Sequence, residues 1–444
     1  MLCWAALLAV GLTAVPAIGG APPHNIHEGV ASCAGANCHG RLAPSGAVVR
    51  QNELFTWQDP ASASGQHSRA WKALTEPRAR AIAGRLGIEA PERAPECIGC
   101  HGDPTPPALR GEKFQVSDGV TCETCHGGAE LWLAGHYTKN ATHAANVAAG
   151  MVALDDPKVR AAICLDCHLG SERRGQFVGH RLMAAGHPRL SFELDLFTSM
   201  QSHHTIDADY IRRKKPASGV QTWAVGQALA LDRAVRLYSN PAIGQDGVFP
   251  QLTFFDCHAC HRRISDERDA RPTALPNPGR PTPVGAPVFN DENMIMLAAS
   301  AEAADRALAS QFEARSRAFH AALNTDRPRA IAAAADLATT SRALADAFAR
   351  KTFSRNDTFA VLDNVLATVL ERYTDYQGSA QGVMAADTLL TALVTEGQVP
   401  AARVAAIRPD LERAYAAVRD PNTYDPIAFR AAFQRVTTAA RGLR

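Results

Sequence analysis

Ten of the eleven cysteines in this 444-residue chain form five pairs, and a histidine directly follows each pair. Four pairs have the spacing C-x-x-C and one has the wider spacing C-x-x-x-x-C. Thiolates and imidazoles bind metals and thiolates also form covalent bonds, so this repeat could carry chemistry. The motifs are Cys33, Cys38 and His39; Cys97, Cys100 and His101; Cys122, Cys125 and His126; Cys164, Cys167 and His168; and Cys257, Cys260 and His261.

Three common uses of paired cysteines explain this pattern poorly. Disulfides need no histidine after every second cysteine. Zinc ribbons need two knuckles at a characteristic separation and no trailing histidine. A thioredoxin-like C-x-x-C occurs once, within an α/β pattern. Covalent haem remains, because two cysteines one helical turn apart can form thioethers and the adjacent histidine can bind the iron. The sequence therefore predicts five covalently attached c-type haems.

The first motif departs from the other four because two extra residues separate its cysteines. We interpret SCAGANCHGR as a haem site in which the extra residues bulge away while both sulfurs still reach the ring. A disulfide or an unoccupied motif is the alternative at this site.

Each haem iron takes a second axial ligand, and its identity sets the reactivity. Histidine gives a low-potential electron carrier, methionine raises the potential, and an open position admits a substrate. We expect His258, between two attached cysteines, to point away from the iron, and Met183 and Met200 to be packing residues. For every histidine candidate, an ordinary surface or core role is the alternative. The candidates are His67, His136 and His187, then His143, His180, and His203 or His204 of the HH pair.

Several stretches resemble the multihaem c-type cytochromes of the cytochrome c-554 type, whose haem packing recurs in hydroxylamine oxidoreductase. The stretches are CAGANCHG, Trp57 with SGQHSRAW, GVTCETCHGGAELW, MAAGHPRLSFELD, and FFDCHACHRRI with a following PGRP. The resemblance covers roughly residues 30–285. It implies a multihaem fold, bis-histidine ligation and electron transfer. The first cysteine loop is wider than in those relatives, and His258 stands where many of them have tyrosine.

The segment that carries the motifs has little strand patterning and much Gly, Pro and His, which is typical of chains wrapped around haems. Residues 220–238 predict a helix, because apolar residues recur at three- and four-residue spacing. Six prolines between positions 272 and 287 predict an irregular connection.

The C-terminal part is rich in alanine and predicts five or six antiparallel helices in a bundle. Helices are expected to start near Asn356 or Asp357, near Pro400 and at Asp425, and one is expected to stop at Gly397. The fold class is therefore mainly α, with a multihaem domain of short helices and loops followed by an all-α bundle. We divide the chain into a signal peptide (1–21), a pentahaem domain (22–265), a Pro-rich linker (266–290) and a helical bundle (291–444).

The first residues, MLCWAALLAVGLTAVPAIGGAPP, form an apolar run closed by small residues, which predicts an exported, periplasmic or secreted protein. No later segment is apolar enough to span a membrane. The formal charge of +2 gives no reason to expect nucleic acid. Redox proteins are the expected partners, and haem propionates would make the chain negative, which favours partners with a basic face.

The leading interpretation is an electron-transfer protein whose closely packed, mostly bis-histidine haems pass electrons between partners. A second is a haem oxidoreductase that acts on a small nitrogen or sulfur compound at one five-coordinate haem. A third is a sensor or assembly scaffold. In each, the bundle is either a structural cap or a surface for docking or homo-oligomerisation.

Overall fold

The computed structural model describes residues 25–43, 50–246, 249–261, 282–283, 286–372 and 375–444. The predicted signal peptide and most of the predicted linker lie outside the described residues. Within them the protein is mainly helical, as the sequence predicts.

The helices fall into a short-helix set and a long-helix set. The first set comprises α1 (Glu53–Gln58), α2 (Ala70–Leu74), α3 (Pro77–Leu86), α4 (Pro95–His101), α5 (Cys122–His126), α6 (His143–Ala148), α7 (Pro157–His168), α8 (His180–Ala184), α9 (Leu194–Met200) and α10 (Ala208–Lys214). The second comprises α11 (Gly219–Ser239), α12 (Glu292–Ala304), α13 (Arg306–Leu323), α14 (Arg327–Arg350), α15 (Arg355–Glu371), α16 (Tyr376–Thr395), α17 (Ala401–Ala405), α18 (Arg408–Ala417) and α19 (Pro426–Arg441).

Short 3₁₀ turns and one small strand pair complete the described elements. The turns are η1 (Val30–Ser32), η2 (Ala63–Arg69), η3 (Pro91–Arg93), η4 (Pro107–Leu109), η5 (Val116–Asp118), η6 (Leu252–Phe254), η7 (Cys257–Ala259) and η8 (Pro421–Thr423). The strands β1 (Gln245–Asp246) and β2 (Phe249–Pro250) pair antiparallel.

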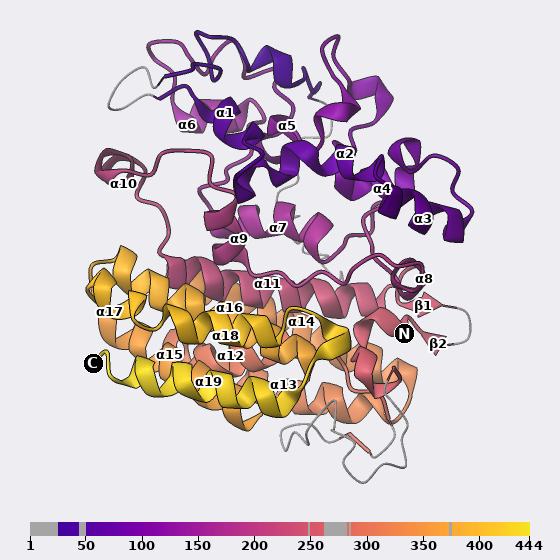
Figure 1. Cartoon of the computed structure of the whole chain (residues 1–444), viewed down its shortest axis with the longest axis vertical. Coiled ribbons are helices and arrows are strands. Elements are labelled where there is room, and N and C mark those ends of the chain that lie inside the picture. Colours follow the sequence, from indigo (N-terminus) through magenta and orange to yellow (C-terminus); the bar gives the residue numbers. More distant parts are fainter. Residues whose placement is uncertain (1–24, 44–49, 247–248, 262–281, 284–285, 373–374) are drawn as a thin grey trace, which may run out of the picture.

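These elements form two layers (Figure 1). We call residues 25–214, with α1–α10, the short-helix layer. We call α11 together with residues 286–444 the long-helix layer. Helix α11 runs along the boundary, packing against α7 and α9 on one side and against α14 and α16 on the other. The fifth cysteine motif begins in η7, which follows the strand pair in the chain.

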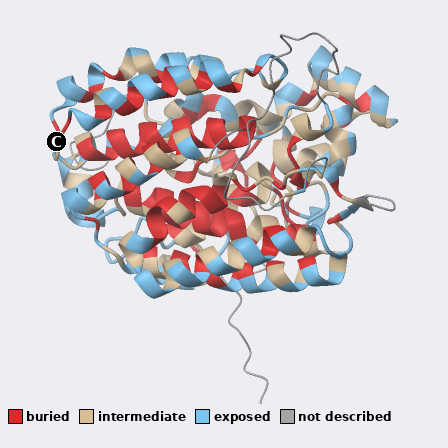
Figure 2. Cartoon of the chain, turned by 90° about the horizontal axis from the view of Figure 1, so that it is seen from below, coloured by how far each residue is buried: buried red, intermediate tan, exposed pale blue. Residues whose placement is uncertain are grey.

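The long-helix layer has a continuous core of side chains. Its inward helix faces are buried and its outer faces are exposed (Figure 2). Fifteen of the 21 residues of α11 are buried, including Trp223, which is fully inaccessible. The core cluster runs from Ala161 to Leu443 and therefore crosses the predicted boundary at residue 291. Helix α11, which the sequence division assigned to the pentahaem domain, packs as part of the bundle.

The helix signals in the sequence are confirmed at several positions. Asp425 caps α19, as predicted, whereas α15 starts at Arg355, slightly before the predicted start, with Ser354 as its cap and Asp357 completing the capping box. Pro400 precedes α17, and Gly397 (φ 67°) follows the end of α16. Residues 291–444 hold α12–α19 among the described residues, so the expected number of five or six helices was too low. The short α17 and the break before α18 account for part of the difference.

The short-helix layer contributes little to that core. Its buried apolar side chains, such as Val30, Trp57, Leu74 and Trp132, lie outside the cluster. Polar contacts join the layers: Lys158 Nζ lies 2.9 Å from Asp346 Oδ1, and Thr388 Oγ1 donates to Glu193 at 2.6 Å. None of the described helices has the length and apolarity needed to cross a membrane.

Candidate haem-binding sites

The four tightly spaced motifs each occupy about one helical turn. Helix α4 ends at His101, α7 ends at His168, and α5 consists of Cys122–His126. The fifth motif begins in η7. Since residues three apart lie on one helix face, both sulfurs of a pair point to the same side. This is the arrangement that two thioether bonds to one porphyrin need.

The widened first motif closes with the same backbone hydrogen bond as a tight one. In the fifth motif, the His261 N–H donates to the Cys257 carbonyl at 2.7 Å. In the first, the His39 N–H donates to the Cys33 carbonyl at 3.0 Å, across two additional residues. Gly40 follows directly, and a Cβ there would lie 2.0 Å from a carbonyl oxygen of the loop. The extra residues therefore bulge out while the ends of the motif keep an equivalent connection.

Each of the five trailing histidines faces another histidine. The ring centroids lie 6.1–6.3 Å apart. Two imidazoles on opposite sides of one metal, with metal–nitrogen bonds of about 2.0–2.1 Å, would have centroids roughly 6.3 Å apart. The spacing therefore fits one iron between each pair. The pairs are His39 with His136, His101 with His187, His126 with His203 and His204, His168 with His67, and His261 with His180.

Hydrogen bonds orient several of these rings through Nδ1. His101 Nδ1 lies 3.0 Å from the Ala70 carbonyl, and His136 Nδ1 lies 2.6 Å from the Leu133 carbonyl. His187 Nδ1 contacts the Pro188 carbonyl at 2.8 Å. A ring that donates from Nδ1 keeps its lone pair on Nε2, which is the state that binds a metal.

Burial favours the same neutral state. It lowers the pKa of His126 to about 3, helped by the neighbouring His204 and His203. It also lowers the pKa of His168 to about 4. The pKa of His67 is lowered by burial as well. Because the charged imidazolium is disfavoured, these side chains are available as metal ligands at neutral pH.

Glu53, on α1, contacts two of the rings. His39 Nδ1 lies 3.0 Å from its Oε2, and His204 Nδ1 lies 3.9 Å from its Oε1. Burial alone would raise the pKa of Glu53, but the contacts with His204 and His39 lower it below its ordinary value. The carboxylate is therefore ionised between a ring of the first pair and a ring of the third. The sequence offered no signal for this role.

The remaining histidines make other contacts. His143 faces none of the five trailing histidines and lies 3.4 Å from Asp155, with both side chains about half exposed. His258 Nε2 lies 2.8 Å from the Pro421 carbonyl, on the side of the bundle. Met200 is half exposed, and Met183 contacts Thr253. His24 lies outside the described residues.

The motifs also approach one another through their sulfurs. A hydrogen bond with Cys122 raises the pKa of the Cys33 thiol, so the first and third motifs touch. Cys167 Sγ lies 3.7 Å from the Gly99 carbonyl, between the cysteines of the second motif. A Cβ on Gly99 would meet the Gly175 carbonyl oxygen at 2.5 Å. Only glycine therefore fits at position 99, where the second motif packs against the loop that follows the fourth motif.

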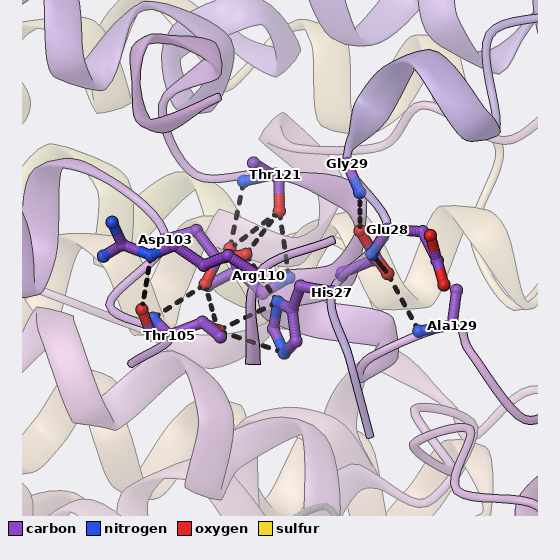
Figure 3. A network of polar contacts seen from close by, with 10 residues as sticks. His27, Glu28, Gly29, Asp103, Thr105, Arg110, Thr121 and Ala129 are labelled. Atoms are coloured by element: carbon purple, nitrogen blue, oxygen red, sulfur yellow. Dashed lines mark hydrogen bonds and ion pairs between the residues drawn. The ribbon is translucent and has the colours of Figure 1, made fainter. Parts of the chain in front are cut away.

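A buried polar network holds the second and third motifs together (Figure 3). His27 Nδ1 lies 2.7 Å from Asp103, which also accepts from Thr105 Oγ1 at 2.6 Å and from Thr121 Oγ1 at 2.8 Å. Glu123, inside the third motif, accepts three backbone N–H groups, those of Glu28, Gly29 and Ala129. The N-terminal segment is thereby fixed against both motifs.

Part of the chain matches a known protein family. Residues 32–127 match the family model described as cytochrome c554 and c-prime. The matched segment is less than half of the chain and contains the first three motifs. No curated protein and no solved structure matches. The match supports a c-type cytochrome, a class that holds haem covalently and transfers electrons.

Proposed function

We propose that this protein is an exported pentahaem cytochrome c that transfers electrons along five bis-histidine haems. The observation that carries the proposal is the facing histidine at every motif, at the spacing that one iron requires. Haem supplies reversible one-electron oxidation and reduction. The chain supplies attachment, axial ligands, and spacing between sites.

The contacts between motifs support an order for the sites. The first motif touches the third through Cys33 and Cys122. The third lies beside the fourth, because the nearby Cys164 and Cys167 help to raise the pKa of the Cys125 thiol. The fourth touches the second through Cys167 and Gly99.

The fifth motif connects to the second through one short segment. His180 and His187 frame α8, and they face the trailing histidines of the fifth and second motifs. Two residues after His187, Arg189 Nη1 lies 3.6 Å from Cys257 Sγ. The proposed order is therefore first, third, fourth, second, fifth, with the first and fifth sites at the ends.

The oxidoreductase alternative needs an iron with an open position. Each trailing histidine faces an imidazole, so no contact among the described residues favours that alternative. Export is the part of the proposal that rests on sequence alone, on the apolar leader before residue 24.

The test is to produce the mature chain in a host that attaches haem and to measure its mass and spectrum. We expect the mass of five haems and a fully low-spin oxidised spectrum that nitrite, hydroxylamine and cyanide leave unchanged. A mass of bare polypeptide, or a high-spin haem in the wild type, contradicts the proposal.

A matched pair of variants tests the ligand assignment. His67→Ala should produce one high-spin haem per chain, because His67 faces His168. His143→Ala should leave all haems low-spin, because His143 contacts Asp155 instead. The reverse result would show that the facing pairs do not predict ligation.

A further inference from the structure

The third motif differs from the other four because two histidines face its trailing histidine. The His126 ring centroid lies 6.3 Å from that of His203 and 6.2 Å from that of His204. One ligand atom from each of the three rings lies within 4.8 Å of the others. A six-coordinate iron bound to His126 has room for only one further imidazole.

Each of the two competing rings has its own Nδ1 partner. His203 Nδ1 lies 3.2 Å from the Gln201 carbonyl and 3.2 Å from the Gln201 side-chain nitrogen. His204 Nδ1 lies 3.9 Å from Glu53 Oε1. A hydrogen bond at Nδ1 leaves Nε2 of His203 to bind a metal, and Nδ1 of His204 faces the Glu53 carboxyl group, which leaves its Nε2 in the same position.

The two rings are adjacent and their segment is held at both ends. Their centroids lie 4.2 Å apart. Gln201 is the C-cap of α9, and Asp207 caps α10 and also contacts Arg50 at 2.8 Å. Exchanging one ring for the other therefore needs only local rotation within residues 202–206.

We propose that His203 and His204 are alternative sixth ligands of the iron at the third motif, and that Glu53 favours His204. The inference rests on the proposed function and adds a ligand exchange to it. In the exchange, one iron–nitrogen bond breaks as the other forms. Each ring binds through a nitrogen lone pair, so the exchange changes no oxidation state.

The two ligand states would differ in their electron donation to the iron. A His203 ligand donates its Nδ1–H to a neutral amide carbonyl. A His204 ligand faces the side-chain carboxyl group of Glu53 instead, and a carboxylate beside Nδ1 raises the basicity of a ligating imidazole. The His204 state therefore stabilises the oxidised iron more strongly. Because Glu53 also contacts His39, the choice of ligand at the third motif is linked to the first motif.

The decisive experiment compares His203→Ala, His204→Ala and the double variant as holoproteins with all haems attached. Each single variant should keep five low-spin haems, and the double variant should gain one high-spin haem that binds cyanide. The low-spin resonance of the third haem should differ between the two single variants. The wild-type resonance should contain both forms.

One outcome overturns the inference. If one single variant alone becomes high-spin and the other keeps the wild-type resonance, the iron has one fixed ligand. The single variants and the wild type decide this even if the double variant does not accumulate. A wild type with fewer than five haems, or with a high-spin haem, would instead contradict the proposed function.

Glu53→Gln gives an independent measurement. It should shift the wild-type third-haem resonance towards the form seen in His204→Ala. In the His204→Ala background it should leave that resonance unchanged. Unaltered proportions in the wild-type background would remove Glu53 from the inference.

Discussion

The two layers of the molecule are held together by different means. The long-helix layer buries a continuous set of apolar side chains, as globular α-helical proteins do. The short-helix layer has scattered buried residues, wide loops and five cysteine motifs in or beside it. The interior of the short-helix layer is therefore expected to consist of haem, whereas that of the long-helix layer consists of its own side chains.

The largest expected effect comes from withholding haem. Without attached haems, the short-helix layer should lose its fold, because its facing histidines and thiols have nothing to pack on. Helices α11–α19 should retain theirs. Hydrogen exchange on chain produced without the attachment machinery would measure this. Equal protection of both layers would contradict the comparison.

The next effect should come from a cavity in the long-helix layer. Phe348 of α14 is fully inaccessible, so Phe348→Ala should lower the free energy of unfolding by about 3–5 kcal/mol. The haem spectrum should not change. Ile427→Ala is the control, because Ile427 is more than half exposed and should cost far less. Denaturant unfolding monitored by circular dichroism would compare the two.

A smaller effect concerns a carboxyl near the boundary between the layers. Burial raises the pKa of Glu292 to about 7, well above its value in the unfolded chain. The unfolded chain therefore releases this proton first as pH rises, and stability should fall between about pH 4.5 and 7 by roughly 3 kcal/mol. Glu292→Gln should flatten this slope in unfolding measured across that range. A slope that persists would assign the pH dependence to other groups.

The smallest effect concerns the midpoint potential of the first haem. Glu53→Gln removes the ionised partner of His39 and should raise the midpoint potential of the first haem, because the ring becomes a weaker donor. Glu96→Gln is the control, since Glu96 contacts the exposed Arg174 instead. Redox titration followed by spectroscopy would resolve the change. A shift of equal size in both variants would indicate a general charge effect.

The sequence predicted the attachment motifs, the helical class and several helix ends, because each depends on residues close together in the chain. Six of the seven predicted candidate ligands face a trailing histidine and His143 does not, but the sequence did not indicate which motif each one faces. His67 follows the first motif and faces the fourth, and His136 follows the third and faces the first. Such crossed pairs depend on how the motifs pack, which no local pattern encodes.

The sequence also did not predict how α11 packs or which residues Glu53 contacts. The apolar spacing in residues 220–238 predicted a helix correctly but could not indicate that it packs into the long-helix core. Nothing in the sequence around Glu53 distinguishes it from a glutamate on the protein surface. Its role follows from the meeting of α1 with the HH segment, about 150 positions later in the chain.

Several histidines face a motif other than the one they follow in the sequence. This arrangement determines whether a fragment of the protein could keep its histidine pairs. Residues 32–127 contain three attachment motifs, yet the histidines that face them, His136, His187 and the HH pair, all lie downstream. His67 is inside the segment but faces a motif outside it. A fragment cut to those limits could bind porphyrin but would leave every iron short of its native partner.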